Sequence, residues 1–214
     1  MGFRVHAFDA HGPNLDLLDA SRALNGAGFT SLLKLHRAVL SDTRGEHVDF
    51  GVHDTNKGAC TVINRNDFIA NANGGDNADL LLPYTLEPRV TATLDDFYSP
   101  TGGSGPYNAH EPRQRIELMK INVEGYECKV LNGARETIKQ RRPRFILTRW
   151  ERKLSSPPAC SLKMMADFLF DLGYVAHHTN FACSRGSAID RNARNWEENF
   201  PSNLLFVDGN RLPY

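Results

Sequence analysis

Residues 116–134 read IELMKINVEGYECKVLNGA, a strand pattern that changes into a helix pattern. The first part, Ile116–Ile121, has the apolar content of a buried strand. Between residues 123 and 140, apolar positions recur at helical spacing and share one face: Val130, Leu131, Ala134 and Ile138. After Pro143, the segment Phe145–Leu147 has the pattern of another strand. A strand, a helix and a second strand in this order predict one unit of a parallel sheet.

The same alternation extends through the rest of the chain. Further strand patterns occur over Phe3–Phe8, Leu32–Leu40, His47–His53, Arg89–Phe97 and Leu204–Val207. Helical stripes run from Pro13 to Leu24 and from Leu162 to Leu172. Residues 64–79 and 99–105 are rich in turn-forming residues, and we expect loops there. Strands alternating with amphipathic helices predict an α/β fold with a mostly parallel sheet.

The size and charge of the chain exclude several classes of protein. It has 214 residues, which predicts a single domain. Lys plus Arg is 25 and Asp plus Glu is 25, so 25 − 25 = 0. A neutral chain lacks the basic footprint of a nucleic-acid-binding protein, and we expect no nucleic-acid partner. No apolar run approaches the roughly 18 residues that a membrane helix requires, so we expect no membrane span.

The cysteines bear on the cellular compartment. Cys60, Cys128, Cys160 and Cys183 form no C-x-x-C pair and no zinc-like spacing. We therefore expect four reduced thiols and no metal site. The N-terminus has no apolar signal-peptide core, and a cytoplasmic location is the default expectation.

Several short motifs occur in an order that resembles a known family. The segment KINVEGYE (residues 120–127) is similar to the pattern K-I-D-V-E-G-Y-E of the FkbM-type methyltransferases. Other matching pieces are V-L-x-G-A at 130–134, R-P at 142–143, T-L-D-D at 93–96, and A-V-L-S-D at 38–42, which is similar to V-A-L-S-D. The resemblance implies a Rossmann-like class I methyltransferase sandwich over residues 1–214. It also implies S-adenosylmethionine as the cofactor and a hydroxyl oxygen as the methyl acceptor.

The resemblance assigns two residues to the cofactor. Asp9 follows the Phe3–Phe8 strand, as does the family's acidic residue that accepts hydrogen bonds from the ribose hydroxyls. An acidic residue also binds ribose in dinucleotide folds, and Asp9 could instead cap the following helix. Ala38 lies where the adenine ring of the cofactor would stack, and core packing explains a small residue there equally well.

The resemblance places three further residues around the acceptor: Lys120, Asn122 and Glu124. Lys120 and Asn122 are two residues apart on a strand, so they face the same side. Glu124 and Glu127 open the next helix, where the helix dipole also favours acidic residues for structural reasons alone. A small-molecule, glycan or lipid hydroxyl is the expected acceptor.

The sequence departs from the family pattern at three places. Only Met1 and Gly2 precede the strand that ends at Asp9, so we expect the first strand and its Gly-rich turn to be absent. Asn122 replaces an Asp, and Thr148 replaces a Glu at a strand end. These changes keep a second hypothesis open, a non-catalytic or truncated methyltransferase-like binding module. A dinucleotide-dependent enzyme is a weaker third, because the sequence contains no G-x-G-x-x-G.

Overall fold

The computed structural model describes residues 2–63, 84–98, 115–149, 161–178, 188–192 and 203–211. The chain divides into two compact units, Met1–Ala92 and Thr93–Tyr214. Both units contain strands and helices, which confirms the predicted α/β class. The predicted loops at 64–79 and 99–105 lie outside the described residues.

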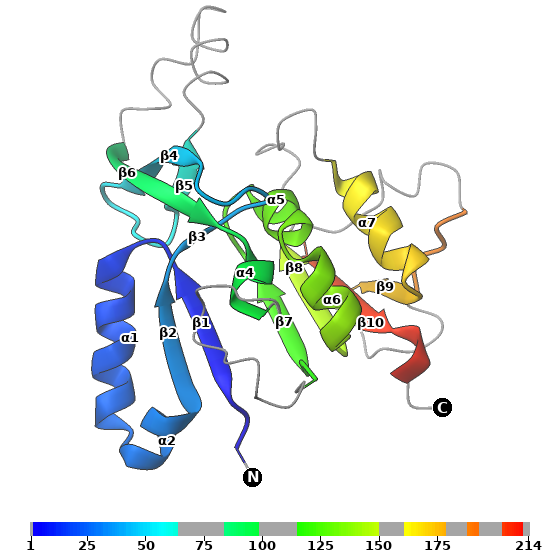
Figure 1. The fold of residues 1–214 in the computed structure, drawn as a ribbon, viewed down its shortest axis with the longest axis horizontal. Coiled ribbons are helices and arrows are strands. Elements are labelled where there is room, and N and C mark those ends of the chain that lie inside the picture. The colour runs from blue at the N-terminus through cyan, green and yellow to red at the C-terminus, as the bar shows by residue number, and fades with distance from the viewer. Residues whose placement is uncertain are drawn as a thin grey trace, which may run out of the picture. The chain divides into compact units, whose positions relative to one another are not determined.

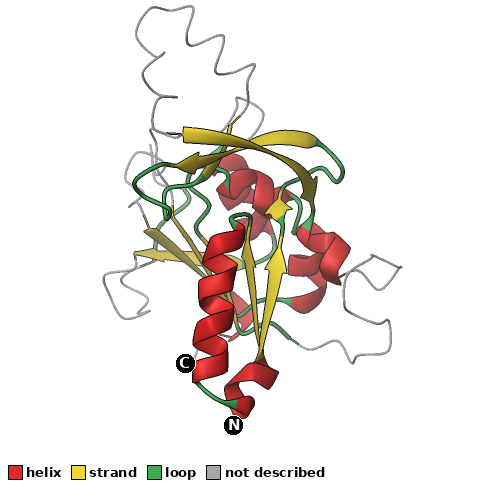
Figure 2. Cartoon of the chain, turned by 90° about the vertical axis from the view of Figure 1, so that its left-hand side faces the viewer, coloured by secondary structure: helices red, strands yellow, loops and turns green. Residues whose placement is uncertain are grey.

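The first unit begins with a strand, two helices and a second strand, and the two strands form a parallel pair. Its elements are β1 (Val5–Asp9), α1 (Gly12–Leu24), α2 (Ala27–Leu32) and β2 (Leu33–Arg37). Val5 pairs with Leu33 and Asp9 pairs with Arg37. Helix α1 has Pro13 in its first turn, where a missing N–H costs nothing, and lies beside the two strands (Figure 1, Figure 2).

A second sheet completes the first unit. It has the order β3-β6-β4-β5 and consists of β3 (Val39–Leu40), β6 (Tyr84–Ala92), β4 (His47–His53) and β5 (Thr61–Ile63). Strand β3 runs parallel to β6, whereas β4 is antiparallel to both β6 and β5. Val39, Phe50 and Val52 form the buried cluster on this sheet.

The second unit contains one described sheet with the order β7-β8-β10-β9. Its strands are β7 (Leu118–Ile121), β8 (Phe145–Arg149), β9 (Tyr174–His178) and β10 (Asn203–Asp208). Its helices are α4 (Leu94–Tyr98), α5 (Glu127–Asn132), α6 (Arg135–Arg141), α7 (Leu162–Asp171) and the 3-10 turn η5 (Gly209–Arg211). The fully buried side chains that form its core include Leu131, Ile138, Ile146, Leu169 and Phe206.

The sheets mix parallel and antiparallel pairs, so the α/β class is confirmed but a mostly parallel sheet is not clearly seen. β7 is parallel to β8, but β10 is antiparallel to both of its neighbours. Strands β7, β8 and β9 therefore run in one direction and only β10 opposes them. In the first unit, the short connection between β4 and β5 forms a hairpin, which forces an antiparallel pair.

Three predicted elements have different bounds in the structure. The strand predicted over Arg89–Phe97 ends at Ala92 and is followed by helix α4. The strand predicted over Leu32–Leu40 is divided at Ala38 into β2 and β3. The single helix predicted between residues 123 and 140 begins at Glu127 and is split into α5 and α6.

The prediction of four reduced cysteines was wrong at Cys128, which is disulfide-bonded. Cys60 is a free thiol. Among the described helices, none is long and apolar enough to cross a membrane.

Candidate functional site

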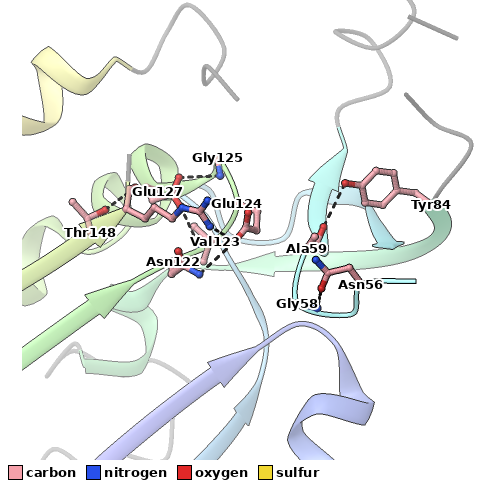
Figure 3. Close-up of polar contacts among 11 residues, drawn as sticks. Asn56, Gly58, Ala59, Tyr84, Asn122, Val123, Glu124, Gly125, Glu127 and Thr148 are labelled. Carbon is pink, nitrogen blue, oxygen red and sulfur yellow. Dashed lines mark hydrogen bonds and ion pairs between the residues drawn. The ribbon is translucent and has the colours of Figure 1, made fainter. Parts of the chain in front are cut away.

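The turn between β7 and α5 is held by a buried carboxylate. Strand β7 ends at Ile121, and the chain reverses through Glu124 (φ +51°) and Gly125 (φ +97°). A left-handed residue other than glycine costs about 1 kcal/mol, so the turn requires other contacts to persist. Glu127 supplies them: its Oε1 accepts from the Val123 N–H at 2.9 Å and its Oε2 from the Gly125 N–H at 3.0 Å (Figure 3).

The surroundings of Glu127 shift its pKa in opposing directions. Its side chain is only 3% exposed. Burial is the largest influence and raises the pKa of Glu127 above its ordinary value of 4.5. The backbone hydrogen bonds from Val123 and Gly125 lower the pKa, and the nearby charge of Glu124 raises it. The turn therefore rests on a carboxylate whose charged form is disfavoured by desolvation.

The turn brings two of the three proposed acceptor residues into contact. The Asn122 amide Nδ2 donates to Glu124 Oε1 at 3.4 Å. The same Glu124 oxygen lies 3.3 Å from Nη1 of Arg149, at the end of β8. Lys120 is exposed on β7 between the buried residues Met119 and Ile121.

Arg149 was not among the proposed site residues, although the strand end at residues 148–151 was expected to face a ligand. Thr148, which replaces the family's Glu, is fully buried, and its Oγ1 donates to the Arg149 carbonyl at 3.4 Å. Alternation along β8 turns the neighbouring Arg149 to the other face, where it pairs with Glu124. The position of Arg149 at the carboxyl end of a predicted parallel strand was the available signal.

The first unit brings Asp9 and Ala38 together. The Ala38 N–H donates to the backbone carbonyl of Asp9 at 3.1 Å. The carboxylate of Asp9 accepts from the His11 N–H at 2.8 Å and from Asn14 Nδ2 at 3.1 Å. The N-cap of α1 is His11, so Asp9 stabilises the turn before the helix instead of capping it directly.

The residues around Asp9 fit an adenosyl group in one respect. An ionised carboxylate has about four acceptor positions, so two remain on Asp9 beyond the contacts with His11 and Asn14. These two could accept the ribose hydroxyls. His11 is 6% exposed, and its Nδ1 is a buried atom without a hydrogen-bond partner in the described part of the chain.

A loop between β4 and β5 borders the Asp9 turn. Asn14 Nδ2 also donates to the Lys57 carbonyl at 3.5 Å, which joins the start of α1 to this loop. Within the loop, Asn56 Oδ1 accepts from the Gly58 N–H at 3.1 Å. Tyr84 donates its hydroxyl to the Ala59 carbonyl at 3.4 Å (Figure 3). The loop is thus ordered by its own polar contacts, and Asn14 was not predicted to connect with it.

The T-L-D-D motif has a structural role in the second unit. Thr93 and Asp96 cap each other: the Thr93 N–H donates to Asp96 Oδ2 at 3.0 Å, and the Asp96 N–H donates to Thr93 Oγ1 at 3.1 Å. Asp95 accepts from the N–H groups of Glu136 and Thr137 at 3.1 and 2.7 Å, at the start of α6. The motif therefore begins α4 and caps α6.

The described residues contain no group of three or more His, Cys, Asp or Glu side chains that could hold a metal ion. His177 is 2% exposed in β9, consistent with packing in the core.

Residues 107–176 match the sequence profile described as the Methyltransferase FkbM domain. This segment resembles an FkbM methyltransferase domain. The match confirms the resemblance inferred from the motifs, and the family name indicates methyl transfer. The FkbM segment includes Lys120, Asn122, Glu124 and Glu127, whereas Asp9 and Ala38 lie outside it.

One solved structure is also similar, the crystal structure of methyltransferase FkbM from Methylobacillus flagellatus KT. The two chains are 15% identical with a TM-score of 0.46, and the alignment covers 95% of this chain and 36% of the other. This chain thus spans 36% of the length of that protein. No curated protein matches the sequence.

Proposed function

We propose that this chain takes part in the S-adenosylmethionine-dependent transfer of a methyl group to a hydroxyl oxygen. The observation that carries the proposal is the FkbM match over residues 107–176, because it includes the turn with Asn122 and Glu124. The proposed acceptor is a small-molecule, glycan or lipid hydroxyl. We also propose that residues 1–214 form one Rossmann-like class I methyltransferase domain. The order β7-β8-β10-β9, with β10 alone reversed, supports a sheet in which parallel strands predominate.

Asp9 and Ala38 are the proposed cofactor residues. The two open acceptor positions on the Asp9 carboxylate suit the paired hydroxyls of a ribose. Ala38 is adjacent through its hydrogen bond to Asp9 and is small enough to leave room for a flat ring. S-adenosylmethionine would supply a methyl group on a positively charged sulfur, so that an acceptor oxygen could bond to the methyl carbon in line as the sulfur leaves as a neutral thioether.

Asn122, Glu124 and Lys120 are the proposed acceptor residues. Asn122 does not titrate, so its part is to orient a hydroxyl by hydrogen bonding. Glu124 can accept the hydroxyl hydrogen bond, and Arg149 offsets its charge. Alignment of two reactants lowers a barrier by about 7–11 kcal/mol, more than a general base contributes, so orientation is the main requirement.

Calorimetric titration of the purified chain with S-adenosylmethionine tests the proposal. We expect saturable binding, weakened about tenfold or more by Asp9→Asn, because a hydrogen bond to a charged group is lost. Asp16→Asn is the matched control, since Asp16 is exposed on α1. Methyl transfer from labelled cofactor is then measured against panels of hydroxylated acceptors.

The outcomes separate the hypotheses. Absence of binding at millimolar cofactor would contradict the methyltransferase proposal for this chain. Binding without transfer to any hydroxylated acceptor would favour the methyltransferase-like binding module. A cytoplasmic location stays a prediction, and the Cys128 disulfide favours an oxidising compartment instead.

A further inference from the structure

We propose that Glu127 is a positioning residue whose carboxylate fixes the turn that presents Asn122 and Glu124. The inference rests on the proposed function for the role of those two side chains, but the geometry of the turn stands independently. Glu127 touches only backbone amides of the turn in the described contacts, so it acts through its neighbours.

The argument begins with the two hydrogen bonds. One carboxylate spans Val123 and Gly125, the residues on either side of Glu124. Glu124 has a left-handed backbone at φ +51°, a conformation that a glutamate rarely adopts without support. Clamping both flanking residues leaves Glu124 with little freedom, and this directs its side chain.

The direction of Glu124 matters because other groups converge on it. Glu124 Oε1 receives Asn122 Nδ2 from within the turn and Arg149 Nη1 from β8. Both contacts end on the same Glu124 oxygen, so a displaced Glu124 side chain would lose both. Through the turn, Glu127 therefore fixes the position of the polar cluster formed by Asn122, Glu124 and Arg149.

The chemistry of the contact requires an ionised carboxylate. A carboxylate offers acceptors on both oxygens, whereas a protonated acid or an amide has a donor on one side. Glu124, on the turn, is the charged group whose field raises the pKa of Glu127, and Arg149 pairs with Glu124. Because burial raises the pKa of Glu127, acidification should reach this carboxylate before ordinary exposed ones.

Amide hydrogen exchange and nitrogen-15 NMR of the whole chain test the proposal. In Glu127→Gln, we expect the Val123 and Gly125 amides to exchange about tenfold faster or more, as expected for loss of a hydrogen bond to a charged group. Glu127→Asp keeps the charge but is one methylene shorter, and it should lose at least one of the two contacts. Glu136→Gln is the matched control, because Glu136 is an exposed first-turn glutamate of α6 that pairs with Lys139.

Wild-type protein supplies a second measurement if a variant fails to fold. Its Val123 and Gly125 amide shifts should titrate together with the Glu127 side chain, at a pH above 4.5. Two results would overturn the proposal. One is that both amides of a folded Glu127→Gln variant exchange at the wild-type rate. The other is that the wild-type amide chemical shifts do not change as Glu127 titrates. The NMR results do not depend on methyl transfer, so they test the role of Glu127 even if the proposed function fails. Cofactor titration of the same variant tests the proposed function separately.

Discussion

Two opposing effects act on the ionised Glu127 side chain: hydrogen bonding and burial. Its carboxylate stabilises the turn through two amides, but its burial makes the charge unfavourable. The net result is a raised pKa, so the folded state favours the protonated acid relative to the unfolded chain. The protonation of this one side chain therefore couples the stability of the fold to pH.

The stability of the protein should carry this signature in its pH dependence. The folded pKa of Glu127 lies above 4.5, so its contribution to stability is fully present below pH 4.5 and is lost as pH rises through the folded pKa. Glu127→Gln removes this titrating group, and we expect its free energy of unfolding to change less than that of wild type between pH 4 and pH 7. Urea unfolding of both proteins at pH 4 and pH 7 measures this. Equal pH dependence in the two proteins would contradict the raised pKa.

Helices α4, α5 and α6 are connected by hydrogen bonds between residues that are far apart in the sequence. The Asp95 N–H donates to the Gly133 carbonyl at 2.9 Å, where α5 ends. The Asp95 carboxylate then binds the first amides of α6. One residue of a short helix thus stabilises the break between two others, which explains why 123–140 does not form a single helix.

Replacing this aspartate should destabilise the second unit. We expect Asp95→Ala to lower the free energy of unfolding by about 1–2 kcal/mol, the range measured for loss of a helix cap. Asp167→Ala is the control, because its ion pair with Lys163 is exposed on α7 and should contribute less than about 1 kcal/mol. Urea unfolding compares the two. A loss of similar size in both variants would show that Asp95 has no capping role.

At the scale of the whole molecule, two units carry different parts of the proposed function. The FkbM match lies within Thr93–Tyr214, whereas the proposed cofactor residues Asp9 and Ala38 lie within Met1–Ala92. The second unit is also crossed by long-range ion pairs. Arg142 binds Asp208, which is 2% exposed, and Glu117 binds both Arg144 and Arg211. These contacts join the ends of β7, β8 and β10.

The disulfide gives a prediction for the intact chain. The chain has four cysteines, and one disulfide uses two of them, so 4 − 2 = 2 thiols remain. Titration of the denatured, unreduced protein with a thiol reagent should therefore find two thiols, rising to four after reduction. The Cys128→Ser variant has three cysteines and cannot form this disulfide. Without reduction, it should therefore show three thiols. Four thiols in unreduced wild-type protein would restore the expectation of reduced cysteines.

The sequence by itself determined several of the strands and helices. Val5–Asp9, His47–His53 and Leu162–Asp171 follow their apolar periodicity, because that periodicity states which face of an element is buried. The motifs at 120–127 and 130–134 likewise pointed to the FkbM family before any contact was known. Asp9, Asn122 and Glu124 were identified at strand ends for the same reason.

Only the tertiary structure decided how those residues are held. The pairing of Arg149 with Glu124 joins residues 25 apart, and the capping of Thr137 by Asp95 joins residues 42 apart. The left-handed Glu124 and the inserted, reversed β10 also depend on neighbours that are remote in sequence. Periodicity encodes burial along one element, whereas hydrogen bonds and ion pairs depend on which elements meet. That information becomes available only when the chain is packed.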